Sequence, residues 1–467
     1  MNIKSLFDKT KNCLSKYLFV FVYFTFFVLA LVPTVLDSSS IVIPTTFITA
    51  YKGFLMVSLL AFICYQIIKK KLKISPTAVC YFSLIIIVYS IYIIVFPSVF
   101  SFVSPAYSYR PGELISIAFS KTMKLSSLFN VFSFAFFSFV SLSFIPSIKL
   151  GVSDLKIYLH LVCFFVLTSC IYALLFQSKS IFASDAYVIA NPFSSFFGNK
   201  NTFGIFLMIA TFSSCLLFYQ FHLKRFALYS MLFATFSFLS RSTTAALLCT
   251  LIVVFTYFFF VVKSFFRKKI ILFLLLFGPL TLLAFLVVVL VSCGHGSAIS
   301  NFFKKLRYID FNNFYNLFSG RGGYWAFGIY LVNRNFALLG YTQPLLDSIV
   351  FESVVNMYTT RSLTSTFLTT LDAYGVVGLS IYFYYLYMII VNIAKIEEKN
   401  IKEMLMLLFI IYVIYGLFES YLLFDTKIGS LILTPLLGGF PLALSKKRNA
   451  ESLLRNKVLN MHTVIEI

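Results

Sequence analysis

Apolar runs of about 20 residues recur along the whole chain, and no other feature constrains its fold as strongly. Because an α-helix rises ~1.5 Å per residue, a run of this length crosses the ~30 Å hydrocarbon layer of a bilayer. Hydrophobic residues make up 60% of the 467 residues, and charged residues only 12%. A soluble domain could not bury this much apolar surface in one core. The sequence therefore predicts an all-α polytopic membrane protein.

We expect about twelve transmembrane helices, forming a single integral membrane domain over residues 1–467. The first run follows four lysines and has no small-residue cleavage site after it, which predicts a retained helix rather than a signal peptide. The predicted spans cover residues 17–36, 43–68, 76–97, 125–148, 156–177, 202–221, 226–240, 243–263, 270–293, 364–392, 403–422 and 428–444.

Basic residues gather in every second connection between the predicted spans. Positive charge marks the cytoplasmic side of membrane proteins, so we expect both termini to be cytoplasmic in a bacterial inner (cytoplasmic) membrane. The net charge of +22 then reflects orientation and contact with anionic membrane lipids. No basic soluble module is present, so we expect no nucleic-acid partner. The basic clusters are Lys69–Lys73, Lys149, Lys224-Arg225, Arg267–Lys269, Lys395–Lys402 and Lys446–Arg448.

The eight cysteines are scattered, mostly within apolar runs, and form no CxxC motif or Cys/His cluster. We interpret them as small core residues rather than as a disulfide or zinc framework. The sequence also lacks a DxD motif, which argues against a nucleotide-sugar donor held by a metal ion. We therefore expect no cofactor and no metal.

Three connections on the outer side are long: 98–124, 178–201 and 294–363. The last lies between the ninth and tenth spans, and we expect it to be a large periplasmic loop, because loops of this length usually carry function. Two interpretations stay open: a solvated surface loop, and a site for an anionic substrate at the outer leaflet. Its charged residues are Lys304, Lys305, Arg307, Asp310, Arg321, Arg334, Asp347, Glu352 and Arg361.

Two motifs on the outer side combine cations with glycine or asparagine. The segment FSGRGGYW (318–325) holds Arg321, Tyr324 and the single Trp of the chain. Its glycines predict close approach of backbone to a ligand, and the guanidinium offers a planar fork to phosphate oxygens. The segment FGNKNTFG (197–204) opens the sixth span with Asn199, Lys200 and Asn201, which suits an anion or a sugar at a helix N-terminus.

Two further motifs lie at other span ends. SRSTTA (240–245) forms the turn before the eighth span, where Arg241 either snorkels to the interface or binds substrate. The tenth span begins TSTFLTTLDAYGVVG (364–378), whose glycines are typical of helix packing. Asp372 in this span and Glu419 in the eleventh are intramembrane acids, which are functional by default, although pairing with an outer arginine is an equal alternative.

The order of these four motifs resembles the O-antigen polymerase and O-antigen ligase family, the Wzy-type polymerases and their relatives. The resemblance covers residues 195–425. It implies a C-type glycosyltransferase-like fold and an undecaprenyl-diphosphate-linked oligosaccharide as substrate at the periplasmic face. It also implies a chain-length regulator protein as a further partner. The expected activity is polymerisation of lipid-linked repeat units into O-antigen or capsular polysaccharide.

The resemblance also assigns roles to residues of the outer side. Cations would hold the diphosphate, and a base would accept the proton of the acceptor hydroxyl. Ligases of the family carry a His where Thr364 stands, so we favour a polymerase over a ligase. The candidate bases are Asp347, Glu352, Asp372 and His295. The candidate substrate-binding residues are Arg321, Arg241, Arg361, Arg334, Lys200, Asn199, Asn201, Tyr324 and Glu419.

A transporter or a lipid-linked oligosaccharide flippase is the remaining alternative. A major-facilitator transporter should show two similar halves joined by a long basic cytoplasmic loop. Here the connection between the sixth and seventh spans covers only about 222–225, and the largest loop lies outside. Flippases generally lack so long an outer loop. These features favour a glycosyltransferase.

Overall fold

The computed structural model describes the chain in fourteen segments, with the gaps between them left aside. They are residues 18–32, 45–70, 74, 76–105, 111–148, 150–181, 193–197, 199–240, 242–264, 317–332, 338–354, 365–421, 423 and 428–445.

The described residues are mostly helical. The α-helices are α2 (Leu18–Ala30), α4 (Thr45–Lys70), α5 (Pro76–Val95), α6 (Lys121–Phe139), α7 (Ile145–Ser147), α8 (Val152–Ile181), α10 (Lys200–Phe221), α11 (Arg225–Leu239), α12 (Thr243–Ser264), α15 (Leu317–Val332), α16 (Gln343–Val354), α17 (Thr366–Ala394), α18 (Lys399–Phe418) and α19 (Ile428–Thr434). Two π-helical turns, η1 (Val140–Phe144) and η5 (Pro435–Gly439), and one 3₁₀ turn, η2 (Ser195–Phe197), adjoin them. The strands β1 (Val99–Val103) and β2 (Leu114–Ala118) form an antiparallel hairpin.

A helix lies at each predicted span except 270–293, which lies outside the described residues. Among the described helices, six are long and apolar enough to cross a membrane. They run over Ala50–Lys69, Lys121–Ser147, Val152–Lys179, Lys200–Phe221, Thr366–Ala394 and Lys399–Phe418. Shorter apolar helices accompany them. The fold is therefore that of a multi-pass helical membrane protein, while the number of twelve spans stays a prediction.

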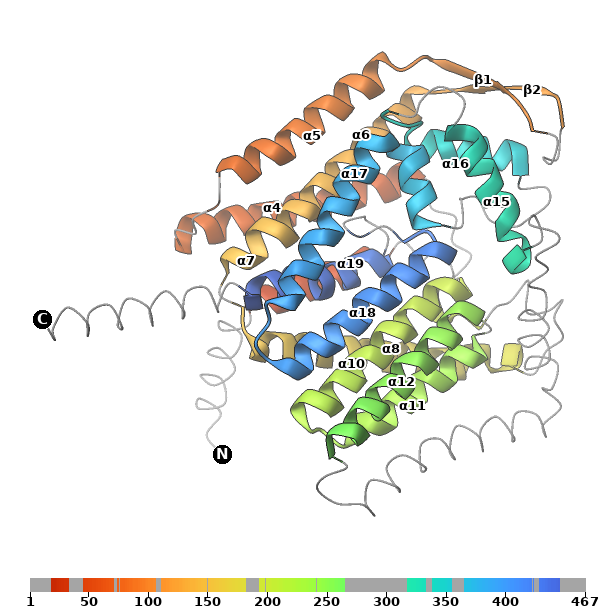
Figure 1. Ribbon diagram of the computed structural model, residues 1–467. Coiled ribbons are helices and arrows are strands. Elements are labelled where there is room, and N and C mark those ends of the chain that lie inside the picture. The colour runs from red at the N-terminus through yellow and green to blue at the C-terminus, as the bar shows by residue number, and fades with distance from the viewer. Residues whose placement is uncertain are drawn as a thin grey trace, which may run out of the picture.

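Helix α10 forms the centre of the helix packing. It contacts α8, α11, α12 and α18, and these helices lie side by side in Figure 1. In the most apolar stretch of α10, 94% of the residues are buried, whereas in that of α17 the share is 39%. Helix α17 contacts α18, and it also contacts α15 and α16 of the 294–363 segment. Residues of the predicted large loop thus pack onto the membrane helices.

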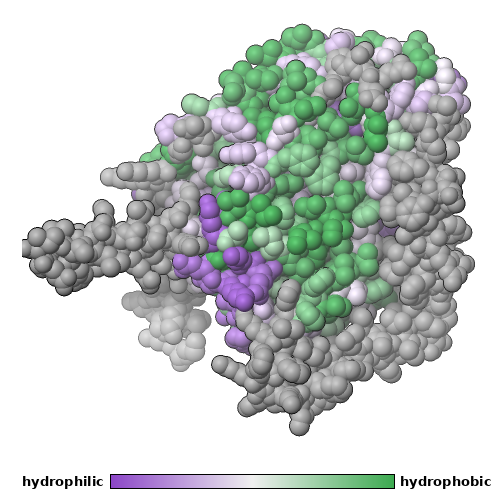
Figure 2. Space-filling view, viewed as in Figure 1, coloured by the Kyte–Doolittle hydropathy of each residue, from purple (hydrophilic) through white to green (hydrophobic). Residues whose placement is uncertain are grey.

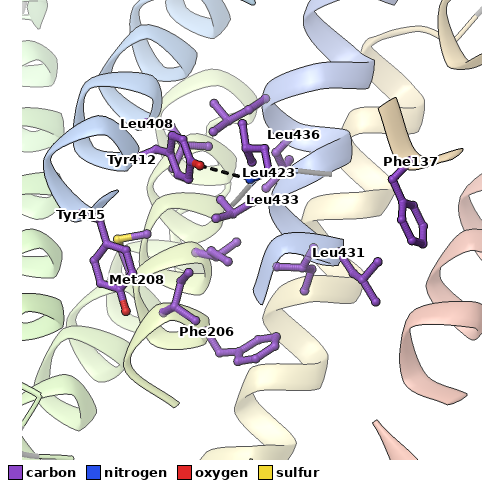
Figure 3. Close-up of a cluster of buried hydrophobic side chains, with 14 of the residues drawn as sticks. Phe137, Phe206, Met208, Leu408, Tyr412, Tyr415, Leu423, Leu431, Leu433 and Leu436 are labelled. Atoms are coloured by element: carbon purple, nitrogen blue, oxygen red, sulfur yellow. Dashed lines mark hydrogen bonds between the residues drawn. The ribbon is translucent and has the colours of Figure 1, made fainter. Parts of the chain in front are cut away.

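A cluster of apolar side chains fills the space between α10, α18 and the C-terminal helix (Figure 3). Pro435 lies within this last helix and has no N–H to donate, so the carbonyl of Leu431, four residues earlier, loses its α-helical partner. Tyr23 of α2 donates its hydroxyl to this carbonyl at 2.9 Å, and Tyr158 of α8 donates to the carbonyl of Ile432, also at 2.9 Å. Two distant helices therefore supply donors beside the proline.

The surface of the described part reflects the membrane environment. Large apolar side chains are exposed on α4, α5, α8 and α17, as the green area of Figure 2 illustrates for one face. Hydrophilic residues gather where α17 turns into α18, at residues 395–403. A surface on which large apolar side chains are widely exposed is suited to lipid rather than to water.

Candidate functional site

Polar side chains from four helices meet where those helices have their ends. The N-termini of α10, α12 and α17 and the C-terminus of α18 contribute to this group, which we name the helix-end cluster. Its members are Asn199, Asn201, Thr202, Ser242, Thr366, Thr369, Tyr415, Glu419, Ser420 and Tyr421. Three motifs that lie far apart in the sequence therefore meet in one place.

The asparagines of the first motif shape the start of α10. Asn199 is the N-cap, and its side-chain oxygen accepts the backbone N–H of Asn201 at 2.8 Å. Such capping satisfies one of the free donors of a helix start. Asn201 in turn accepts the hydroxyl of Ser242 at 3.2 Å, which joins α10 to the residue that precedes α12. Lys200, the first residue of α10, is half-buried beside them.

Hydroxyl groups join α17 to the end of α18. Thr366 donates its hydroxyl to the carbonyl of Glu419 at 2.8 Å and accepts the backbone N–H of Tyr421 at 2.9 Å. Ser420 donates to the hydroxyl of Thr369 at 3.1 Å. The hydroxyls of Tyr421 and Thr202 lie 3.0 Å apart, which closes the connection back to α10. Hydrogen bonds thus connect α10, α17 and the end of α18 within the cluster.

Glu419 is the acid of this cluster. It ends α18 as its C-cap residue and is only 8% exposed. Its backbone carbonyl accepts the hydroxyl of Thr366, which also accepts the backbone N–H of Tyr421. A carboxylate next to such a polar group can hold the hydroxyls of a sugar or accept a proton from one of them.

The motif FSGRGGYW differs from its expected form. We predicted a glycine-rich loop whose backbone approaches a ligand, but residues 317–332 form the helix α15. Its glycines therefore lie in helical backbone, where amides are engaged along the helix. The helix nevertheless lies close to the cluster, because the rings of Trp325 and Phe418 are 6.1 Å apart and α15 contacts α17. Tyr324 is 2% exposed and packs into the core.

The three predicted catalytic carboxylates have different surroundings. Asp347 is half-buried on α16 and accepts the side-chain amide of Gln343 at 2.7 Å. Glu352 is exposed near the end of the same helix. Asp372 on α17 is 1% exposed, and its carboxyl oxygens have no hydrogen-bond partner among the described residues. The three carboxylates thus lie in different surroundings, on two helices that contact each other.

Helix α17 is broken three residues after Asp372. Gly375 has a left-handed backbone (φ 68°), and a Cβ atom at this position would overlap the carbonyl of Leu338. Our prediction that this glycine serves helix packing was incomplete, because it also permits the break. The segment 338–342 then supplies backbone partners. The N–H groups of Tyr341 and Thr342 donate to the carbonyls of Asp372 and Ala373 at 2.7 and 2.9 Å.

Two tyrosines of α5 donate hydrogen bonds to backbone carbonyls at the break in α17. Tyr89 donates its hydroxyl to the carbonyl of Tyr374 at 2.6 Å, and Tyr92 donates to the carbonyl of Gly340. Broken helices at membrane depth occur where protein surrounds the free backbone groups, and they often mark functional sites. Nothing in the sequence pattern indicated the role of these tyrosines, although the glycines at both sides of the contact could have suggested a close backbone approach.

Several predicted site residues lie outside the described part of the chain. They are Arg241, Arg334, Arg361, Thr364 and His295. Arg321 belongs to α15, but its side chain is likewise outside what the structure describes. The predicted cation site for a diphosphate therefore stays a prediction. Sequence reasoning missed Tyr415 and Tyr421, which nothing in a tyrosine-rich chain distinguishes from lipid-facing aromatics.

Comparison with models of known protein families, with curated proteins and with solved structures finds no match for this chain.

Proposed function

We propose that this protein is a polysaccharide polymerase, a glycosyltransferase that joins polyprenyl-diphosphate-linked oligosaccharide repeat units at the periplasmic face of a bacterial inner membrane. The observation that carries the proposal is the helix-end cluster, in which Ser242 donates to Asn201, Tyr421 donates its backbone N–H to Thr366, and the hydroxyls of Tyr421 and Thr202 pair. Asn201, Thr202, Ser242 and Thr366 come from motifs that resemble those of O-antigen polymerases. Hydroxyl and amide groups at the ends of apolar helices suit a sugar whose lipid tail stays in the bilayer.

The proposed reaction needs no cofactor. The acceptor hydroxyl attacks the anomeric carbon of the donor sugar while the bond from that carbon to the diphosphate oxygen breaks. The electron pair leaves with the polyprenyl diphosphate, and the hydroxyl proton passes to a carboxylate. Five cations hold the diphosphate and stabilise its charge as it leaves. They are Arg241, Arg321, Arg334, Arg361 and Lys200.

We propose Glu419 as the proton acceptor, or as the residue that orients the acceptor hydroxyl. A base has to be ionised before it takes a proton, and burying an ionised carboxylate without a partner costs several kcal/mol. Asp372 has no hydrogen-bond partner among the described residues, whereas Glu419 is part of the helix-end cluster, where its backbone carbonyl accepts the hydroxyl of Thr366. Asp347 and Glu352 lie on α16, outside the helix-end cluster. We therefore propose Glu419 ahead of the other three carboxylates.

The test is the length of surface glycan in a deletion strain complemented with variants. Without a polymerase, the strain should carry single-unit glycans, and the wild-type gene should restore long chains. We expect Glu419→Gln to give single units only, because the amide keeps the shape but cannot accept the proton. The matched control is Glu397→Gln, on the exposed turn after α17, which should restore long chains. Long-chain glycan from Glu419→Gln at normal protein level would contradict the assignment.

The same assay separates the remaining carboxylates. If Glu419 is the base, then Asp347→Asn and Glu352→Gln restore long chains, and Thr364→Ala retains substantial activity. If one of Asp347, Glu352 or Asp372 is the base instead, its neutral variant alone gives single units while Glu419→Gln polymerises. Protein level in the membrane has to be measured for Asp372→Asn, since this residue is buried.

A further inference from the structure

The hairpin of β1 and β2 has two faces of different character. Its inner face consists of Phe100, Phe102, Ile115 and Ile117, all buried. The ring of Phe100 lies 5.1 Å from that of Tyr341, and the ring of Phe102 lies 6.5 Å from that of Phe327 on α15. The inner face thus covers the helices of the 294–363 segment, as Figure 1 shows for α16.

The opposite face, which we name the outer hairpin face, is exposed and carries no charge. It consists of Val99, Ser101, Val103, Leu114, Ser116 and Ala118. Leu114 is 70% exposed and Val99 is 58% exposed. Antiparallel strands with one solvated face normally alternate apolar with polar residues. Here the only polar side chains are two serines, whose hydroxyls lie 2.7 Å apart and pair with each other.

The outer hairpin face continues an apolar surface of α5. That helix exposes Leu84, Ile87, Ile91, Ile94 and Val95 to between 53% and 75%. In a multi-pass membrane protein such a row of side chains faces lipid. The chain passes from Val95 into Val99 within four residues, and Figure 1 shows the hairpin extending from the end of α5. The exposed apolar row of α5 is therefore followed along the chain by the exposed apolar face of the hairpin.

The depth of this surface follows from its polar groups. Lys124 donates to the carbonyls of Ile94 and Phe96 at 3.1 and 2.9 Å, which caps α5 with an ammonium group. Lysines at helix ends place their charge at the membrane interface. Within the part of the chain that the structure describes, the sheet has only two strands, so each strand leaves one edge without a strand partner there. Open edges do not occur in the hydrocarbon region. The hairpin thus belongs at the interface.

We propose that the outer hairpin face rests on the bilayer, in contact with lipid at the boundary between headgroups and acyl chains. The hairpin then holds α15 and α16 close to the membrane surface through its inner face. Its occupant is bilayer lipid, because the surface continues the lipid-facing side of α5. A second copy of the chain or water in this position would give different results in the following experiment.

The experiment uses tryptophan fluorescence of the full chain in phosphatidylcholine vesicles. Trp325→Phe removes the single tryptophan, and Leu114→Trp or Val99→Trp then places a probe on the outer hairpin face. Ile91→Trp on α5 is the lipid-facing control, and Glu397→Trp is the water-facing control. Quenching is measured with lipids brominated near the ester groups, with lipids brominated near the chain ends, and with acrylamide.

We expect lipids brominated near the ester groups to quench both hairpin probes strongly. The quenching should equal that of Ile91→Trp by whichever of the two bromolipids quenches it more. We expect a smaller loss from chain-end bromines, and less acrylamide quenching than for Glu397→Trp. Acrylamide quenching equal to that of the water-facing control, without quenching by bromolipid, would overturn the proposal in favour of a solvated face. Protection from both quenchers would overturn it in favour of a protein partner. Two probes keep the test valid if one variant fails to fold.

Discussion

Single residues decide where the backbone of α17 leaves the helical path. Gly375 adopts a left-handed conformation against Leu338, and Gly340 (φ 76°) lies against the carbonyl of Asp372. The sequence predicted a helix here, because a glycine within an apolar run reads as helix packing. The left-handed conformation depends on a segment more than thirty residues earlier in the chain. Such long-range partners leave no local pattern in the sequence.

We predict that Gly375→Ala destabilises the protein. A methyl group would overlap the carbonyl of Leu338, and left-handed backbone costs of order 1–3 kcal/mol for a residue other than glycine. The control is Gly53→Ala in α4, where a Cβ atom would lie 3.8 Å from the ring of Phe129. The measurement is thermal unfolding in detergent. A Gly375→Ala midpoint equal to that of Gly53→Ala would refute the importance of the break.

The cations of the 294–363 segment give a second prediction at this scale. We expect Arg321→Ala to abolish polymerisation while leaving expression intact, since losing a charge-assisted bond to the leaving diphosphate should remove ~2–4 kcal/mol of transition-state stabilisation. Arg241→Ala and Arg361→Ala should be strongly impaired. Arg321→Lys should rescue poorly, because an ammonium offers no planar fork. Arg225→Ala, at the exposed start of α11, is the control. Long-chain glycan from all three alanine variants would eliminate the diphosphate-binding role.

At the scale of elements, the apolar runs predicted helix positions well and helix details poorly. Described helices begin within a few residues of the predicted spans, because burial in a bilayer fixes both their length and their type. Glycine content misled the prediction for 318–325, which is helical in α15. The alternating patterns VFSFV and LISIA in the 98–124 connection are a strand signal that the prediction of spans did not include.

The interrupted C-terminal helix allows a test of how elements are held together. We predict that Tyr23→Phe destabilises the fold by ~1–3 kcal/mol, because the buried carbonyl of Leu431 loses its donor near the Pro435 break. Tyr158→Phe should act in the same way at Ile432. Tyr51→Phe removes a bond of similar length, 3.0 Å to Leu29, at an exposed position, and should change stability little. Equal unfolding midpoints for Tyr23→Phe and Tyr51→Phe would show that the break needs no donor.

At the scale of the whole molecule, the sequence predicted a helical membrane protein, and the structure agrees. The site could be predicted only in part. The motifs named the helix ends that meet, whereas the network of Thr366, Tyr415 and Tyr421 depends on packing that no motif encodes. Orientation in the membrane follows from charge alone and is a prediction.

Reporter fusions test that orientation. We expect cytoplasmic signal at Lys71 and periplasmic signal at Asn333, because lysine and arginine gather on the cytoplasmic side. A cytoplasmic signal at Asn333 would place α15 and the helix-end cluster on the wrong side for a periplasmic donor. The proposed function would then fail together with the topology.

The central claim is that this chain itself transfers glycan from a polyprenyl-diphosphate donor onto another repeat unit. The most direct measurement reconstitutes the purified full chain in vesicles with an undecaprenyl-diphosphate-linked oligosaccharide from the producing strain. If the chain is a polymerase, we expect products of increasing repeat number and release of undecaprenyl diphosphate in proportion to the new linkages. Both should be lost with Glu419→Gln. Donor left unchanged by active, correctly inserted protein would contradict the account, as would transfer only to a lipid core, the result expected of a ligase.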